Sequence, residues 1–160
     1  MLLRSTGKGA IDLAAEAGAT WIARMGSAGE KAVIAQLERA GCRDMLAIRN
    51  AAHQGLDIVC RMPDGGFLVV EVKSSLNGAA LAKRVLPANQ RNMDEMCRRV
   101  LSQAANGRGP YRGIDAETRR RAQELWAIYR RNQKDVQGAV AKVDMSTGAI
   151  RAERWLRDGD

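Results

Sequence analysis

The chain is poor in aromatic side chains and has no long apolar segment. Phe, Trp and Tyr make up 4% of its 160 residues, so most of them are needed in a core, and a platform for stacking nucleic-acid bases is not expected. No run of about 18 apolar residues occurs, which argues against a membrane-spanning helix. The N-terminus lacks a charged and then apolar secretory signal, and we expect any export to use another route.

Histidine and cysteine are scarce as well. The single histidine, His53, argues against mechanisms that need two, such as paired-histidine ribonucleases or metalloproteases with a His-Glu-x-x-His motif, and we expect it to lie in a loop. Cys42, Cys60 and Cys97 lack the spacing of metal ligands. Because Cys60 and Cys97 lie among apolar residues, we expect buried thiols and a reducing working compartment.

Positive charge, by contrast, is abundant and unevenly distributed. The formal net charge is +8. Residues 1–80 contain 9 Lys and Arg against 8 Asp and Glu, whereas residues 81–160 contain 17 against 10. A basic surface of this kind favours a polyanionic partner, with nucleic acid as the first candidate; a merely solvated basic surface is the alternative.

The length predicts one domain with a substantial core. Residues 1–25 are rich in Gly and Ala, and we interpret them as a lead-in or linker with a short helix around Ile11–Met25. Residues 26–160 form the folded domain in this interpretation. A helix is predicted from Ser27 to about Ala40, with Ser27 and Glu30 as a capping box and Gly41 at its end.

The remaining elements follow in an order typical of an α+β (mixed α/β) domain and not of a doubly wound sheet. Pro87 precedes a helix predicted from Ala88 to Ala105, and Asp115 caps a further helix that ends near Asn132. A closing hairpin is expected around Ser146-Thr147-Gly148. The predicted strands are Met45–Ile48, Gly55–Val59, Phe67–Lys73, Val136–Met145 and Ala149–Leu156.

The central strands carry three charged residues where charges are normally excluded. Asp57 interrupts the first apolar strand, and Glu71 and Lys73 interrupt the second. Side chains alternate along a strand, so Glu71 and Lys73 share one face. Whether Asp57 joins them depends on the register of the hairpin.

The turn between these strands predicts that register. Pro63, Asp64 and Gly65 suit a three-residue hairpin loop, in which Gly65 adopts the left-handed conformation. Such a loop pairs Met62 with Gly66 and, by counting back, Asp57 with Glu71. A two-residue loop would place Asp57 opposite Val72 instead and would separate the acids. The turn therefore favours a single face with two carboxylates and a lysine.

This combination suits metal-dependent hydrolysis of a phosphodiester. Mg²⁺ or Mn²⁺ held by Asp57 and Glu71 would activate water and neutralise charge on the phosphoryl group. A backbone carbonyl of Val70 or Val72 could supply a further oxygen ligand. Lys73 would orient the attacking water or balance the charge of the phosphate.

The motif resembles that of the PD-(D/E)xK nuclease superfamily. Gly55-Leu56-Asp57 is followed after about 13 residues by Glu71-Val72-Lys73 at the end of an apolar strand. Leu56 stands where the family commonly has proline. The resemblance covers roughly residues 27–101 and leaves the closing hairpin outside. It implies a restriction-endonuclease-like core and a metal-dependent endonuclease activity.

The same resemblance implies two further site residues. Members of the family commonly carry a glutamate on the helix before the first strand and a glutamine on the helix after the lysine strand, and Glu30 and Gln90 match these positions. Glu30 would then serve a second metal ion or the water, and Gln90 would help to orient the site. The implied metal ligands are Asp57, Glu71 and Glu30, and the implied catalytic residues are Glu30, Asp57, Glu71, Lys73 and Gln90.

Within the superfamily, the sequence around Asn50, Gly55–Val59 and Pro63–Gly66 is most similar to that of the C-terminal nuclease domains of bacterial polymorphic toxins. That similarity implies a DNA-cleaving effector, delivered into the cytoplasm of a rival bacterium by type VI secretion or contact-dependent inhibition. A cognate immunity protein, expected to be acidic, would neutralise it. The alternatives are an RNA-cleaving (tRNA-cleaving) toxin, a housekeeping repair or junction-resolving nuclease in the cytoplasm, and a non-catalytic nucleic-acid-binding module.

Each site residue also has an ordinary structural interpretation. Three apolar residues on the predicted face, Val59, Phe67 and Val69, argue against solvent exposure of the two strand acids. The alternatives are a capping role for Glu30, a solvent-facing position for Asp57 and Glu71, a surface position for Lys73 and a plain helix-start position for Gln90.

Basic residues that could contact a nucleic-acid backbone lie in the second half of the chain. On the helix after Asp115, arginines recur at a spacing of eleven residues and stack in two adjacent rows. They predict sequence-tolerant, salt-dependent phosphate contacts that lead toward the metal site, with a solvated helix face as the alternative. The candidate nucleic-acid-binding residues are Lys83, Arg84, Arg91, Arg119, Arg120, Arg130, Arg131 and Lys134.

Overall fold

The structure is a computed structural model that describes residues 2–3 and 21–160. Most of the predicted lead-in, including Ile11 to Thr20, lies outside the described residues. The elements in chain order are β1 (Leu2–Leu3), α1 (Trp21–Arg39), β2 (Arg43–Arg49), β3 (Gly55–Arg61), β4 (Phe67–Ser75), α2 (Gly78–Ala82), α3 (Ala88–Arg91), α4 (Met93–Asn106), α5 (Ala116–Arg131), β5 (Val136–Asp144) and β6 (Ala149–Arg154).

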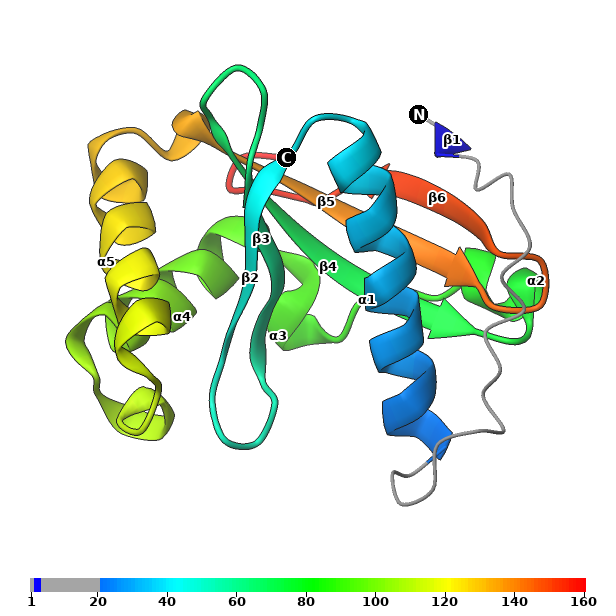
Figure 1. The fold of residues 1–160 in the computed structure, drawn as a ribbon, viewed down its shortest axis with the longest axis horizontal. Helices are drawn as coiled ribbons and strands as arrows, with labels where there is room; N and C mark the ends of the chain where they lie inside the picture. Colours follow the sequence, from blue (N-terminus) through cyan, green and yellow to red (C-terminus); the bar gives the residue numbers. More distant parts are fainter. Residues whose placement is uncertain (1, 4–20) are drawn as a thin grey trace.

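The strands form one mixed sheet in the order β1-β6-β5-β4-β3-β2. Every neighbouring pair is antiparallel except β4 and β5, which run parallel. This confirms the α+β class and the closing hairpin. The hairpin is not an addition at the periphery, however, because β5 lies beside β4 in the interior of the sheet (Figure 1). Strand β4 is largely apolar on both faces, which is typical of a strand in a sheet that is covered on both faces.

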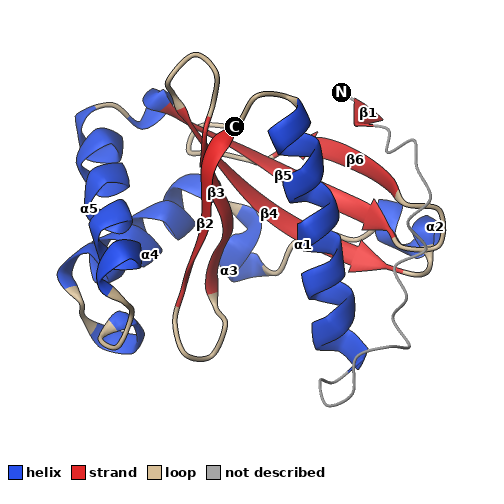
Figure 2. Ribbon diagram, in the orientation of Figure 1, coloured by secondary structure: helices blue, strands red, loops and turns tan. Residues whose placement is uncertain are grey.

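Helices cover both faces of this sheet (Figure 2). On one face, Val33 and Leu37 of α1 pack against Ile58, Val70 and Val72. On the other face, α4 and α5 pack against the alternate side chains of the same strands in a larger apolar cluster. The three cysteines are free, and two of them, Cys60 and Cys97, are fully buried as predicted. None of the helices within residues 21–160 combines the length and apolar character needed to cross a membrane.

The N-terminal boundary predicted for the first helix is wrong. Helix α1 already includes Trp21, so Ser27 lies within it and does not cap it. A residue in the middle of a helix has no free backbone N–H groups ahead of it to cap, because these groups are bonded to the preceding turn. The predicted end is confirmed, since the helix stops at Arg39 and Gly41 adopts a φ of +86°.

Gly29 allows α1 to approach the sheet closely. A Cβ atom at this position would lie 1.8 Å from Oγ of Ser74 in β4. Only a residue without a side chain fits such an approach. The next residue along the helix is Glu30, which is therefore held close to the sheet.

The helix predicted from Ala88 to Ala105 is two helices. Asn92 has an extended backbone between α3 and α4, and its side chain accepts a hydrogen bond from the Glu95 amide at 2.9 Å. Residues 92 and 156 form a parallel bridge, and the Met93 amide donates to the Leu156 carbonyl at 2.8 Å. The contact with Leu156, far along the chain, therefore interrupts a helix that the sequence of residues 88–105 favours. The cap predicted for the next helix is confirmed, because Asp115 accepts from the Thr118 amide at 2.8 Å.

Candidate functional site

The hairpin of β3 and β4 has the predicted register. The Met62 amide donates to the Gly66 carbonyl at 2.7 Å, and Gly65 adopts a φ of +89° in the loop between them. The ladder that follows pairs Arg61 with Phe67 and ends with Ile58 opposite Val70. One step beyond that last pair, the same register brings Asp57 opposite Glu71.

At Asp57, a side-chain oxygen takes the place of a backbone carbonyl as the hydrogen-bond acceptor between the two strands. Oδ2 of Asp57 accepts from the Val72 amide at 2.9 Å. The bond fixes the Asp57 carboxylate between the ends of β3 and β4, and the Asp57 side chain is only 16% exposed. The alternative of a solvent-facing acid does not hold for Asp57, and still less for Glu71, which is 2% exposed.

Glu71 is an incompletely satisfied buried carboxylate. Its Oε1 accepts from Nζ of Lys73 at 2.7 Å, whereas its Oε2 is buried and has no hydrogen-bond partner. Burial raises the pKa of Glu71, the negative charge of Asp57 raises it further, and the ammonium group of Lys73 lowers it, so that the pKa is about 7 instead of 4.5. When ionised, Glu71 therefore carries a negative charge that Lys73 stabilises only in part.

Lys73 is fixed from two sides. Its ammonium group donates to Oε1 of Glu71 and also to Oε1 of Gln90, at 3.0 Å. Gln90 lies on α3, and the indole N–H of Trp155 donates to its backbone carbonyl at 2.7 Å. The C-terminal segment, which the family resemblance left outside, therefore anchors a residue of the candidate site.

Glu30 reaches the same cluster through a residue that the sequence analysis did not single out. Nη2 of Arg49 lies 2.6 Å from Oε1 of Glu30 and 2.6 Å from Oδ1 of Asp57. The two carboxylates outweigh the effect of burial and raise the pKa of Arg49, which stays positively charged. The signal available in the sequence was a lone arginine at the end of the strand Met45–Ile48, directly before the turn that leads to Asp57.

Hydrogen bonds hold the loop between β2 and β3, which brings Arg49 at the end of β2 close to Asp57 near the start of β3. Oδ1 of Asn50 accepts from the amides of Ala52 and Gln54, and the hydroxyl of Tyr111 donates to the Gln54 carbonyl at 3.2 Å. His53 lies in this loop as predicted and is exposed. Next to the loop, a groove of about 340 Å³ runs beside Gln90 and is lined by Arg99, Gln103 and Tyr111 among others.

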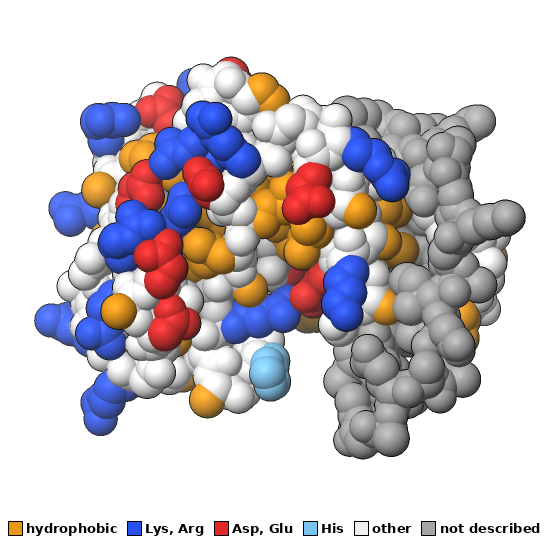
Figure 3. Space-filling model, in the orientation of Figure 1, with side chains coloured by type: hydrophobic (Ala, Val, Ile, Leu, Met, Phe, Trp, Pro, Cys, Tyr) orange, Lys and Arg blue, Asp and Glu red, His pale blue; other side chains and the backbone are white. Residues whose placement is uncertain are grey.

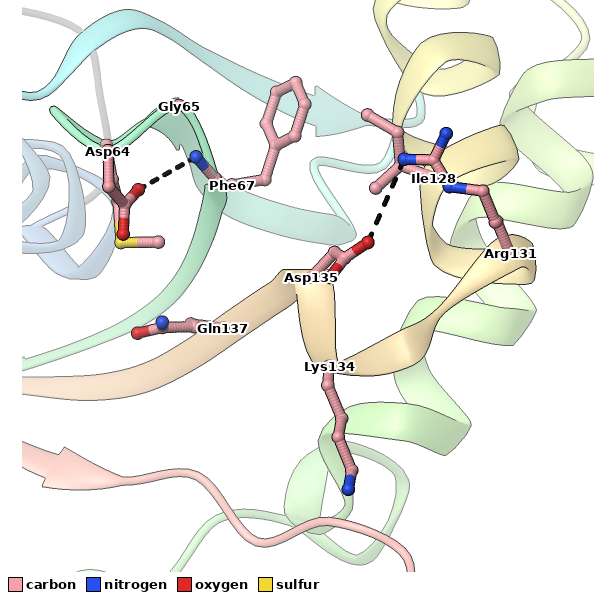
Figure 4. Close-up of a pocket in the computed structure, with 10 residues that line it drawn as sticks. Asp64, Gly65, Phe67, Ile128, Arg131, Lys134, Asp135 and Gln137 are labelled. Carbon is pink, nitrogen blue, oxygen red and sulfur yellow. Dashed lines mark hydrogen bonds and ion pairs between the residues drawn. The ribbon is translucent and has the colours of Figure 1, made fainter.

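Two of the predicted basic residues, Arg131 at the end of α5 and Lys134 just beyond it, lie away from this cluster. Arg131 and Lys134 line a groove of about 400 Å³ at the tip of the β3–β4 hairpin. Gly66 at that tip is five strand residues from Glu71, or about 17 Å. Figure 4 shows Arg131 paired with Asp135 and the Lys134 side chain pointing away from the hairpin turn.

The other α5 arginines are engaged within the chain. Arg119 donates to the Arg112 carbonyl, Arg120 pairs with Glu117 at 2.7 Å, and Arg130 lies over the ring of Trp126. On the face drawn in Figure 3, acidic and basic side chains alternate over α5. The predicted rows of arginines are thus part of a surface on which acidic and basic side chains are mixed.

The remaining three basic candidates lie nearer to the site. Lys83 and Arg84 follow α2 and are exposed, and Arg91 is the neighbour of Gln90 on α3. Arg84 and Arg91 line a smaller groove of about 180 Å³ together with Trp155. Of the predicted basic residues, Arg91 is thus the one next to a residue of the cluster in the chain.

The donor set around Glu71 fits a hard divalent cation of the Mg²⁺ type. Among the described residues no group of three or more His, Cys, Asp or Glu side chains is arranged to hold a metal. Mg²⁺ keeps several waters, however, and is commonly bound through one or two carboxylates. Asp57 and Glu71 supply two, and the partnerless Oε2 of Glu71 is a buried acceptor that a cation would satisfy.

Comparison with known proteins identified no relative. No family model, no curated protein and no solved structure matches this chain. The geometry of the site and the sequence motif are therefore the two indications of function.

Proposed function

We propose that this protein is a metal-dependent nuclease of the PD-(D/E)xK type with a restriction-endonuclease-like core. The observation that carries the proposal is the Glu71 carboxylate, which is buried, has one oxygen without a partner and a pKa of about 7, and lies beside Asp57 and Lys73. A structural acid at this depth would have all its hydrogen bonds made. Strongly perturbed buried acids of this kind are typical of catalytic sites.

Asp57, Glu71 and Lys73 each have a role in hydrolysis of a phosphodiester. Asp57 and Glu71 would hold Mg²⁺ or Mn²⁺. The bound ion would supply Lewis-acid activation of a water and would neutralise charge on the phosphoryl oxygens. Lys73, kept in position by Glu71 and Gln90, would orient the attacking water and donate toward the phosphate. Hydrolysis would form a bond from the water oxygen to phosphorus and break the bond from phosphorus to the sugar oxygen, and the proton lost by the water would be balanced by one gained by that sugar oxygen.

Lys73 provides the sharpest test, because the neighbouring strand offers a matched control. Lys142 of β5 lies directly opposite Lys73 in the sheet and pairs with Glu153 at 3.0 Å, so it too is a lysine with little exposure that is bound to a glutamate. With Mg²⁺ and plasmid DNA, we expect Lys73→Met to lose about 100-fold or more in cleavage rate, whereas Lys142→Met keeps it. EDTA should stop cleavage by the unmodified protein. Equal loss in both lysine variants would count against the assignment.

DNA is the favoured substrate, as expected for the superfamily. The absence of an aromatic base-stacking platform in the composition and the net charge of +8 favour binding through phosphates, which does not depend on sequence. Parallel assays on plasmid DNA, tRNA and ribosomal RNA at the same ionic strength would separate a DNase from an RNA-cleaving toxin. Tight metal-independent binding of all three without cleavage would instead favour a non-catalytic binding module.

The motif resemblance further supports an antibacterial effector domain that an acidic immunity protein neutralises. Expression in the bacterial cytoplasm should then arrest growth, and the Glu71→Gln variant should not. Co-expression of a small acidic protein encoded next to the toxin should relieve the arrest. A repair or junction nuclease would be tolerated at the same expression level.

A further inference from the structure

Arg49 has no role in the proposed hydrolysis, yet it occupies a central position in the cluster. A single nitrogen, Nη2, lies 2.6 Å from Glu30 and 2.6 Å from Asp57. Both contacts are short charge-assisted hydrogen bonds, and the three side chains are each about one-fifth exposed. Arg49 therefore fills the space between two carboxylates that are held by different elements, α1 and β3.

That space is where a second divalent cation would have to bind. Oxygen ligands at about 2 Å must converge on such an ion, and the oxygens of Glu30 and Asp57 that point to one common position are Oε1 of Glu30 and Oδ1 of Asp57. Both already converge on Nη2 of Arg49. A guanidinium group and a divalent ion cannot occupy the same position.

The other carboxylate pair is not blocked in this way. Oδ2 of Asp57 accepts one bond, from the Val72 amide, and a carboxylate oxygen has a second lone pair. Oε2 of Glu71 has no partner. One ion can therefore bind between Asp57 and Glu71 while Arg49 stays in place.

We propose that Arg49 serves as a built-in second cation, which limits the site to one divalent ion and makes Glu30 a positioning residue for Arg49. The inference depends on the proposed function, because it assumes an ion at Asp57 and Glu71. It replaces the metal-ligand role that the family resemblance implied for Glu30. The fixed charge of Arg49 would supply the electrostatic part of what a second ion does, without a second binding equilibrium.

The test is the stoichiometry and affinity of Mn²⁺ binding, measured by isothermal titration calorimetry and by the electron paramagnetic resonance of bound Mn²⁺, without any substrate. The unmodified protein should bind one ion, and Glu71→Gln should lose it. Arg49→Leu should bind two ions, because it leaves Glu30 and Asp57 with no cation between them. Arg49→Lys keeps a positive charge there and should still bind one ion.

Glu30→Gln keeps the test decisive if the Arg49→Leu chain does not fold. Gln retains an oxygen acceptor for Arg49 and leaves Asp57 and Glu71 in place, so Mn²⁺ affinity should change by less than about threefold, whereas loss of a charged direct ligand would lower it by about tenfold or more. Two ions in the unmodified protein, one ion in folded Arg49→Leu, or a tenfold loss in Glu30→Gln would each overturn the inference. Absence of any ion from the unmodified protein would instead overturn the proposed function itself.

Discussion

Two carboxylates in this molecule are equally buried and differ in almost every other respect. Asp94 at the start of α4 and Glu71 in β4 are each 2% exposed. Asp94 accepts hydrogen bonds from the guanidinium group of Arg157, the hydroxyl of Tyr129 and the amide of Asp158. Burial raises its pKa, but the bonds from Arg157 and Tyr129 outweigh this and lower it to about 2. Glu71 has one partner, and its pKa is about 7.

The difference shows that burial alone does not determine the state of an acid. The bonds to Asp94 tie the C-terminal segment to α4 and α5, so the negative charge contributes to the stability of the fold. At Glu71 the nearest groups include a second acid, and one oxygen is left without a donor. The hydrogen-bond network around Asp94 is complete, whereas the network around Glu71 is open to a cation.

The largest expected effect is on cleavage. Glu71→Gln should lower the rate by at least about 1,000-fold, or roughly 4 kcal/mol in transition-state stabilisation, because it removes a proposed ligand and the partner of Lys73. Asp94→Asn, a substitution of the same kind in an equally buried position, should leave the rate per folded molecule within about twofold. Plasmid cleavage with Mg²⁺ measures both. A similar loss in the two variants would remove the distinction between the two networks.

For stability, the two variants should rank in the opposite order: Asp94→Asn should have the larger effect and Glu71→Gln the smaller. Asp94→Asn leaves the half-buried Arg157 without its counter-charge, and we expect the free energy of unfolding to fall by roughly 2–3 kcal/mol. Glu71→Gln removes a charge that lacks sufficient partners, so it should leave stability at pH 8 unchanged or raise it. Urea unfolding of the metal-free proteins, followed by circular dichroism, provides the comparison. Destabilisation of both variants by the same amount would contradict it.

The two acids should also give the stability opposite pH dependences. The pKa of Glu71 is raised in the folded state, so its contribution is complete below pH 4.5 and is lost as the pH rises to about 7, by roughly 3 kcal/mol. The pKa of Asp94 is lowered, so its contribution is present above pH 4 and is lost toward pH 2. Unfolding in EDTA between pH 4.5 and 8 should show the first trend, and Glu71→Gln should abolish it. An unchanged slope in that variant would assign the trend to other groups.

The smallest effect concerns Gln90, which connects the two regions. Trp155 from the C-terminal segment fixes its backbone, and its side chain accepts from Lys73. Gln90→Ala should slow cleavage about tenfold, or roughly 1.4 kcal/mol, by leaving Lys73 with one acceptor, with little change in stability. Asn89→Ala, an exposed neighbour on α3, is the matched control. If both changes prove neutral, Gln90 has no positioning role.

Much of the hairpin could be predicted because its information is local. The residues Pro63, Asp64 and Gly65 specify the loop, and the loop specifies the register. The register then determines which side chains share a face with Asp57 and Glu71. The same holds for the Asp115 cap and for the end of α1 at Gly41, since each depends on a few adjacent residues.

The predictions that were wrong depended on residues outside the local motif. Ser27 has the sequence of an N-cap, but the residues before it continue the helix. Asn92 lies in a segment with a helical pattern, and its contact with Leu156 interrupts the helix. In both cases tertiary contacts or flanking residues outweigh a local preference that is small by comparison.

By itself, the sequence determined the hairpin, the positions of Asp57, Glu71 and Lys73 on it, and the α+β order of elements, because turn chemistry and strand periodicity act over a few residues. The tertiary structure decided what surrounds the acids. Only the packing of α1 against β4 at Gly29 and the docking of α3 on Trp155 bring Glu30 and Gln90 to the site. Only that packing reveals Arg49 between two carboxylates and leaves one oxygen of Glu71 without a partner.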